Sequence, residues 1–230
     1  FAEMTLVHKN GLVAVPDDIR PETASVLGCA VTTGMGAVLH SASVHTGQTV
    51  AVIGLGGIGF AAVQAARLAG AAQIIGIDVV PGKLDRAVRF GATHVVNARE
   101  ADPVAAVREL TGTGVHHAFE AVGSGATAGQ AFAMLRPGGT ATVMGMIPDS
   151  QPVQIRGAEL FLEEKRIQGS FMGSNHFKVD IPLYAHFNRV GLLQLDDLVT
   201  ARCDLATIND GFKALASGQE IRVVARVGEM

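Results

Sequence analysis

The stretch VIGLGGIGF, residues 52–60, places four glycines within six positions directly after an apolar run. Glycine loses more conformational freedom on folding than any other residue and packs no side chain, so this density needs a structural reason. The spacing is Gly54-x-Gly56-x-x-Gly59. Such a spacing indicates a nucleotide site only where a strand precedes it and a helix follows it. The flanking sequence therefore decides what the glycines do.

Short β-rich runs alternate with helical patterns along most of the chain. Strands are predicted at Thr49–Ile53, Gln73–Asp78, His94–Asn97, Val115–Ala121, Thr140–Gly145 and Arg166–Phe171. Helices are predicted at Ile58–Ala69, Lys83–Phe90, Pro103–Leu110 and Ala126–Leu135, the last stopped by Pro137-Gly138-Gly139. Strands that alternate with helices need crossover connections, and hence a parallel sheet covered on both faces. We therefore predict an α/β fold with a doubly wound, six-stranded parallel Rossmann sheet.

The segments before and after this pattern do not continue the alternation of strands and helices. The first 15 residues look like extended chain, and one or two short helices are predicted within Ala24–His40. Toward the C-terminus we predict a helix from Pro182, a helix capped by Thr207 with Ile208, Phe212 and Leu215 facing inward, and a strand at Ile221–Val227. The chain is accordingly divided into a connecting segment (1–30), a dinucleotide-binding domain (31–175) and C-terminal helices with a closing strand (176–230).

Between a strand and a helix, the glycine motif predicts a dinucleotide site. Gly54 allows the tight turn, Gly56 lets a pyrophosphate approach the backbone, and Gly59 lets the helix pack closely on the strand. The helix N-terminus offers unpaired N–H groups and a partial positive charge to the phosphates. The predicted cofactor-binding residues of this turn are Gly54, Leu55, Gly56, Gly57, Ile58 and Gly59.

The second predicted strand ends at Asp78, where an acid would bind the hydroxyls of the adenosine ribose. Its carboxylate accepts hydrogen bonds from a 2′-hydroxyl but repels a 2′-phosphate, and no arginine follows in DVVPGK (78–83). The sequence therefore favours NAD over NADP. Val79 and Lys83 are predicted to border the same ribose, although an exposed lysine at a helix start is an equally good interpretation of Lys83.

The nicotinamide half of the cofactor is expected beyond the ends of the first and fourth strands, where the strand order reverses. The loops there are AVGSG (121–125) and MGMIP (144–148), and their small residues leave room for a ring. Val122 and Met146 are the predicted contacts, with a packing role as the alternative for both.

Charge and cysteine content exclude other classes. The net charge is −3 and no block of lysine or arginine occurs, so nothing favours nucleic acid as a partner. Cys29 and Cys203 form neither a CxxC pair nor a disulfide framework, which fits a reducing cytosol. No apolar run reaches the roughly 18 residues that span a bilayer. We therefore expect a cytoplasmic protein without a membrane or nucleic-acid partner.

Several segments together resemble the coenzyme-binding half of the zinc-dependent medium-chain alcohol dehydrogenases. They are LGCAVTTGMGAV (27–38), VAVIGLGGIG (50–59), IIGIDVVPGK (74–83), FGATHVVN (90–97) and FEAVGS (119–124). RPGGTATVMGMIP, GSFMGSN and GQEIRVVARV extend the match nearly from end to end. The resemblance implies hydride transfer between a small alcohol or aldehyde and NAD, with a zinc ion that lowers the pKa of the alcohol.

The resemblance assigns roles to three further residues. Cys29 matches one of the three protein ligands of the catalytic zinc, whereas a lone cysteine among apolar residues otherwise reads as a small buried hydrophobe. Thr33 matches a residue beside the nicotinamide and is the predicted catalytic residue of this chain. Arg222 matches a residue that pairs with the cofactor pyrophosphate.

The sequence also departs from that family, because it has no GHE-type segment and no CxxCxxC run. In the family these belong to an N-terminal catalytic domain, and a catalytic zinc needs three protein ligands. The chain starts with Phe1, so we expect that domain to precede it and this part alone to be inactive and free of stoichiometric zinc. Two alternatives stay open: a zinc-free quinone-reductase-type enzyme, which commonly takes NADPH, and a non-catalytic NAD-binding module.

The segment 151–171 lies next to the predicted edge strand and carries Leu160, Phe161 and Leu162. An apolar sheet edge favours pairing with a second copy, and a two-fold interface is the commonest closed solution. The family resemblance implies the same edge. We therefore expect a homodimer, unless a helix or the catalytic domain covers this edge.

Overall fold

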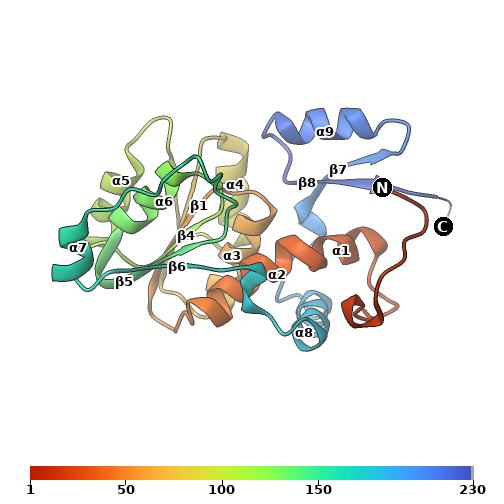
Figure 1. The fold of residues 1–230 in the computed structure, drawn as a ribbon, viewed down its shortest axis with the longest axis horizontal. Helices are drawn as coiled ribbons and strands as arrows, with labels where there is room; N and C mark the ends of the chain where they lie inside the picture. Colours follow the sequence, from red (N-terminus) through yellow and green to blue (C-terminus); the bar gives the residue numbers. More distant parts are fainter. Residues whose placement is uncertain (229–230) are drawn as a thin grey trace.

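The computed structural model describes residues 1–228, and a six-stranded sheet dominates one end of it (Figure 1). Its strands are β1 (Thr49–Ile53), β2 (Gln73–Asp78), β3 (His94–Asn97), β4 (Val115–Glu120), β5 (Leu135–Val143) and β6 (Arg166–Gly169). The order is β3-β2-β1-β4-β5-β6, and neighbouring strands are parallel. The predicted doubly wound Rossmann fold is therefore confirmed.

Helices cover both faces of this sheet. They are α3 (Gly57–Leu68), α4 (Pro81–Phe90), α5 (Pro103–Thr111) and α6 (Gly125–Ala133), with the short α7 (Gly157–Leu162) before β6. Alternate residues of β1 enter different cores: Val52 packs in the cluster that contains Phe60, and Ile53 in the cluster that contains Phe132. Burial on both sides explains why this strand is apolar from Val50 to Ile53.

The start of β5 differs from the prediction. The strand begins at Leu135 instead of Thr140, and the Pro-Gly-Gly sequence that was expected to stop a helix lies inside it. The pairing with β4 is irregular between Val115 and His117, and Gly138 has a φ of +74°. Proline removes a ladder donor and glycine accepts the left-handed backbone, so this strand bends where the sequence suggested a break.

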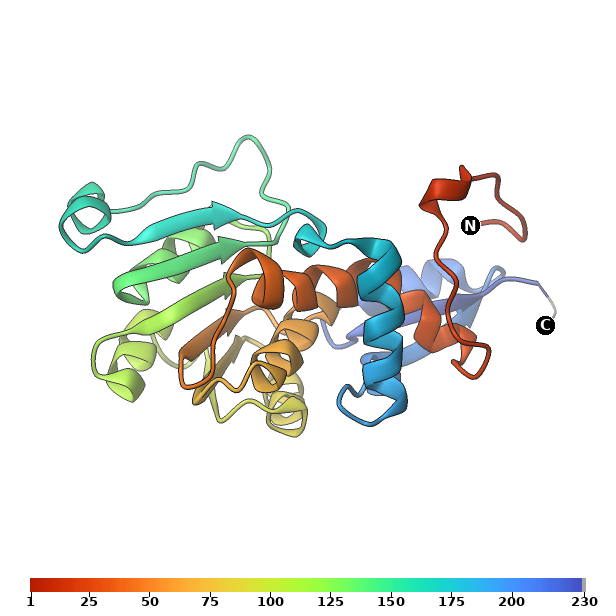
Figure 2. The ribbon, with the colours of Figure 1, turned by 90° about the horizontal axis from the view of Figure 1, so that it is seen from below.

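A single long helix runs from Pro21 to Ser41 and joins the two ends of the molecule (Figure 2). It consists of α1 (Pro21–Val26), the π-helical η2 (Leu27–Val31), α2 (Thr32–Gly36) and the π-helical η3 (Ala37–Ser41). Its length and mean hydropathy of 1.3 would suffice to cross a membrane, but 67% of the apolar stretch is buried within the protein, as in a core helix. The one or two short helices that were predicted here are therefore parts of one longer helix.

Glycines interrupt the sequence of this helix because its neighbours come very close. A Cβ atom at Gly34 would stand 2.3 Å from the carbonyl oxygen of Ile58, in α3. One at Gly36 would stand 2.2 Å from the carbonyl oxygen of Gly173. Here the glycines mark helix packing and do not end the helix.

The C-terminal region adds α8 (Phe177–Arg189), which crosses the long helix (Figure 2), and a separate two-stranded parallel sheet. This sheet pairs β7 (Val199–Asp204), which was not predicted, with β8 (Arg222–Arg226), and α9 (Ile208–Ala216) connects them. Short 3-10 turns are η1 (Lys9–Gly11), η4 (Met172–Ser174) and η5 (Asp196–Leu198).

Three predictions about these helices were wrong. α8 begins five residues before Pro182, because the Asp180 carboxylate accepts a hydrogen bond from the His176 N–H and stabilises an earlier start. On α9, the Thr207 hydroxyl bonds Asp204 and does not cap the helix. Phe212 is 53% exposed and stacks edge-on against Phe1. The apolar side of α9 therefore does not face a closed core.

Candidate functional site

The β1–α3 turn has the geometry that the glycine motif predicts. Gly54 has a φ of +92°, in the left-handed region that favours glycine. A Cβ atom at Gly59 would stand 1.9 Å from the Gly54 carbonyl oxygen, so only glycine fits there. Around Gly56, in contrast, no heavy atom lies within 4 Å of a Cβ position. The turn is therefore tight at both ends and open to a ligand in its middle.

Asp78 lies beside this turn and is held by backbone donors. Its Oδ2 accepts a hydrogen bond of 2.7 Å from the Leu55 N–H. Its Oδ1 accepts bonds from the N–H groups of Val79 and Val80, at 2.7 and 3.0 Å. Val79 is exposed, and Lys83 is half-buried in the first turn of α4. The structure thus brings the predicted ribose-binding acid next to the glycine turn, with its carboxylate in a fixed orientation.

Arg222 reaches the same turn from the other sheet. It is the first residue of β8, and a Cβ atom at Gly57 would lie 2.3 Å from its Nε. This Nε is buried and has no hydrogen-bond partner. A buried guanidinium donor that lacks a partner is costly, and here it lies at the N-terminus of α3. The unpaired donor, the helix N-terminus and the open Gly56 together fit a pyrophosphate group.

The loops at the expected nicotinamide end also adjoin this turn. A Cβ atom at Gly54 would stand 2.6 Å from the Cγ2 of Val122, so Val122 lies against the turn. Met146 lies next to Gly123 through its backbone, but its side chain is 94% exposed and has no contact that places it in a site. The structure therefore places Val122 at the turn. The role of the Met146 side chain remains a prediction.

Glu120 organises the Val122 loop, and the sequence interpretation missed it. This residue is fully buried at the end of β4. Its Oε1 accepts hydrogen bonds from the N–H groups of Val122 and Gly123 and from the Thr127 hydroxyl, at 2.9, 2.7 and 2.7 Å. An acid at the end of a strand, in FEAVGS as in IGIDVV, was the signal that could have found it.

Thr33 and Cys29 lie on the long helix, close to α3. Thr33 is buried, and its hydroxyl donates a hydrogen bond to the Met172 sulfur at 3.8 Å. Cys29, in the π-helical turn η2, is exposed, so it is not the small buried hydrophobe of the alternative interpretation. Within residues 1–228 no three histidine, cysteine, aspartate or glutamate side chains gather to hold a metal ion. The described residues therefore do not form a zinc site around Cys29.

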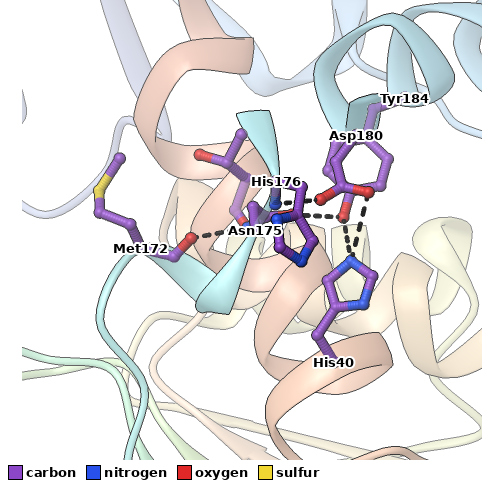
Figure 3. A network of polar contacts seen from close by, with 7 residues as sticks. His40, Met172, Asn175, His176, Asp180 and Tyr184 are labelled. Atoms are coloured by element: carbon purple, nitrogen blue, oxygen red, sulfur yellow. Dashed lines mark hydrogen bonds and ion pairs between the residues drawn. The ribbon is translucent and has the colours of Figure 1, made fainter. Parts of the chain in front are cut away.

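A polar network fixes the turn that carries Met172 (Figure 3). The Asn175 amide donates hydrogen bonds to the carbonyl oxygens of Thr32 and Met172, at 2.7 and 2.6 Å. The Tyr184 hydroxyl donates to the Asn175 Oδ1 at 2.7 Å, and burial raises the pKa of this tyrosine. Met172 itself adopts a φ of +50°, a conformation that costs energy outside glycine and needs such support.

The same network includes a contact between a histidine and an aspartate at its rim. The Asp180 Oδ1 lies 3.5 Å from the Nε2 of His40, while its Oδ2 accepts the His176 N–H at 2.6 Å (Figure 3). Asp180 is buried, whereas His40 is partly exposed. These contacts tie α8, the long helix and the 172–174 turn together. Sequence reasoning could not find them, because the partners lie far apart in the chain.

Comparisons with known proteins agree on one family. Residues 57–186 match the family described as zinc-binding dehydrogenase. Alcohol dehydrogenase B of Mycobacterium tuberculosis is 36% identical over 230 residues, which cover 98% of this chain and 61% of that protein. The chain thus spans about three fifths of the length of such curated relatives.

Solved structures show the same fold. Benzyl alcohol dehydrogenase from Acinetobacter calcoaceticus superposes with a TM-score of 0.90 at 31% identity, over 94% of this chain and 59% of that one. A protein from Sinorhizobium meliloti, solved with NADP bound, superposes with a TM-score of 0.82 at 27% identity, over 91% of this chain and 61% of that one.

Proposed function

The chain belongs to the zinc-binding dehydrogenase family, and from this membership we propose that it is the NAD-binding part of an alcohol dehydrogenase. The parent protein would transfer hydride between a small alcohol or aldehyde and NAD. One observation carries the proposal: the buried Arg222 Nε lacks a partner beside the open glycine turn. A dinucleotide pyrophosphate supplies the missing acceptor.

Each part of the cofactor meets a different group of this chain. The N-terminus of α3 and the Arg222 guanidinium would hold the two phosphates, because both offer donors and positive charge. Asp78 would accept hydrogen bonds from the adenosine ribose hydroxyls. Val122 and Thr33 would border the nicotinamide, which supplies the carbon that takes or gives the hydride when the cofactor is bound.

Asp78 supports NAD rather than NADP as the cofactor. Three backbone N–H groups orient its carboxylate, so it cannot turn away from a 2′-phosphate without losing those hydrogen bonds. No arginine follows within residues 78–83 to neutralise such a phosphate. The Sinorhizobium relative was solved with NADP, so family membership alone does not decide the cofactor. The preference for NAD rests on Asp78.

We assign Cys29 as one ligand of a zinc ion in the parent protein, and its exposure supports this assignment over a packing role. A zinc site needs further ligands, and those would have to come from outside residues 1–228. No step of the reaction is therefore derived through zinc. Hydride transfer by the chain alone is not expected.

Titration calorimetry with NADH and NADPH tests the proposal. The chain should bind NADH more tightly, and Asp78→Ser should narrow the difference by about 1–3 kcal/mol, the usual range for hydrogen bonds to charged groups. Asp85→Asn, at an exposed position of α4, is the matched control and should preserve the difference. Equal affinities in the unaltered chain would contradict the role of Asp78. Absence of binding for both dinucleotides would contradict the proposed function itself.

A further inference from the structure

A second cavity lies at the opposite edge of the six-stranded sheet from the glycine turn. It has a volume of about 440 Å³ and is bordered by residues at the amino ends of β4, β5 and β6 and by the loop before β1. The lining residues that matter here are His45, Gln48, His116, His117, Arg136 and Arg166. None of them belongs to the site described above.

The lining is positively charged and has no compensating acid. Arg136 and Arg166 both border the cavity, and none of its lining residues is an aspartate or glutamate. In the described part of the chain, neither arginine forms an ion pair with a carboxylate. Two guanidinium groups without an anion, at the wall of one cavity, leave a position where an anion is favoured.

His116 lies against one of these arginines. The Arg136 NH1 is 2.6 Å from the Nε2 of His116. Burial and the Arg136 charge both lower the pKa of His116. The other N–H groups of Arg136 remain for a ligand.

His117 adds an unsatisfied polar atom to the same wall. Gln48 presents its Oε1 to the His117 Nε2 at 3.0 Å, and that oxygen also accepts the His45 N–H at 2.8 Å. The Nε2 must therefore carry the hydrogen, which leaves a lone pair on Nδ1. This ring is only 8% exposed, and its Nδ1 has no partner. A lone pair on a buried nitrogen calls for a hydrogen-bond donor, such as a hydroxyl group of the ligand, and not for a phosphate oxygen.

We propose that this cavity binds a phosphate group, held between Arg136 and Arg166. The planar guanidinium fork matches phosphate oxygens better than it matches a spherical anion such as chloride. The volume exceeds what one phosphate group fills, and it lies in the range typical of small organic ligands. Inorganic phosphate and a small phosphate monoester share the chemistry that the arginines recognise. The inference does not depend on the proposed dehydrogenase function.

Amide NMR and calorimetry in a phosphate-free chloride buffer test this site, with inorganic phosphate and glycerol 3-phosphate as probes and glycerol as the uncharged control. We expect saturable binding of the phosphates, no binding of glycerol, and shifts of the amide signals of residues 116–117, 136, 138–140 and 166. Tighter binding of glycerol 3-phosphate identifies a monoester as the ligand, and equal binding identifies the free ion. Shifts confined to residues 54–60 would assign the anion to the glycine turn and overturn the proposal.

Variants separate this site from general electrostatic attraction. Arg166→Gln should weaken phosphate binding at least about tenfold, since a hydrogen bond to a charged group contributes about 1.5–3 kcal/mol. Arg166 is exposed, so its replacement leaves the fold intact. Arg136→Gln should weaken binding as well, and its amide spectrum reports whether the His116 contact was needed for folding. Arg156→Gln, which removes the same charge from an exposed site elsewhere, should not change binding. An equal loss in Arg156→Gln and Arg166→Gln would overturn the proposal.

Discussion

Arg222 and Gly57 lie so close together that a Cβ atom at position 57 would stand 2.3 Å from the Arg222 Nε. The two residues come from different sheets, because Gly57 opens α3 and Arg222 opens β8. A pyrophosphate at the glycine turn would therefore be held by both parts of the chain at once. Binding of the cofactor should stabilise the two-stranded sheet as well as the Rossmann sheet.

Arg222→Gln should lower the affinity for NADH by about 10- to 100-fold, because it removes a charged donor whose Nε has no protein partner to lose. Adenosine, which lacks the phosphates, should bind the variant and the unaltered chain alike. Arg226→Gln changes an exposed arginine of the same strand and should leave both affinities unchanged. Calorimetry with the two ligands measures this. An equal loss of adenosine binding would mean that Arg222 supports the fold and not the phosphates.

Gly59 and Gly56 should respond to alanine in opposite ways. Gly59→Ala forces a methyl group to within 1.9 Å of the Gly54 carbonyl oxygen, so we expect a loss of about 1–3 kcal/mol or more in the free energy of unfolding. Gly56→Ala adds its methyl group in open space and should change that free energy by less than about 0.5 kcal/mol. It should nevertheless weaken NADH binding, because the methyl group occupies the approach of the pyrophosphate. Urea denaturation and calorimetry separate the two effects, and unchanged NADH affinity in Gly56→Ala would argue against this approach.

His117 should make the protein less stable as the pH falls below about 6.5. Burial, with smaller effects of His116 and His45, lowers its pKa from 6.5 to about 4. Between these pH values the His117 ring binds a proton in the unfolded chain but not in the folded one. The free energy of unfolding is therefore highest above pH 6.5 and declines toward pH 4. At about 1.4 kcal/mol for each pKa unit, the loss amounts to roughly 3 kcal/mol.

Urea denaturation over this pH range, in phosphate-free buffers, measures the loss. His117→Phe keeps a flat ring but cannot be protonated, and it should remove most of the slope. His8→Gln, in the exposed N-terminal segment, should retain it. A slope that persists in His117→Phe would assign the effect to other groups.

The chain should form a dimer through the outer edge of β6. This strand is the last in the sheet order, and the adjacent α7 carries Phe161 and Leu162, which are 81% and 74% exposed. Light scattering at about micromolar concentration should report twice the monomer mass, since a two-fold pairing would bury these side chains. Phe161→Glu should give a monomer, whereas Val179→Glu, on the exposed side of α8, should not. A chain that stays monomeric on concentration would contradict pairing along this edge.

The sequence predicts the first three strands with the bounds that the structure shows. The first two are short apolar runs that are buried on both faces, which makes this signal strong. The third lies at the sheet edge and is buried only at Val96. The second sheet was only half predicted, because β7 (VTARCD) is half-buried and of mixed polarity. Its pairing with β8 depends on a crossover through α9, which no local pattern shows. The long helix was hidden by glycines that serve packing.

The residues of the site also fall into those that the sequence could predict and those that it could not. Gly54, Gly56, Gly59 and Asp78 belong to one local motif, so their spacing along the chain could be interpreted directly. Glu120 left a comparable signal that was overlooked. Asn175 could not be found, because its role depends on Thr32, which lies far away in the sequence. Contacts of this kind arise only from the tertiary fold.

The close contacts of Gly34 and Gly36 also limit how this protein can move. The long helix meets α3 at Gly34 and the 172–174 turn at Gly36, and sliding it would bring residues with side chains to points where no Cβ atom fits. We therefore expect these elements to move as one unit, with any hinge outside this contact region. Cys29, on the same helix, should therefore travel with the glycine turn as one rigid body, so that the thiol keeps its distance from a nicotinamide bound as proposed above.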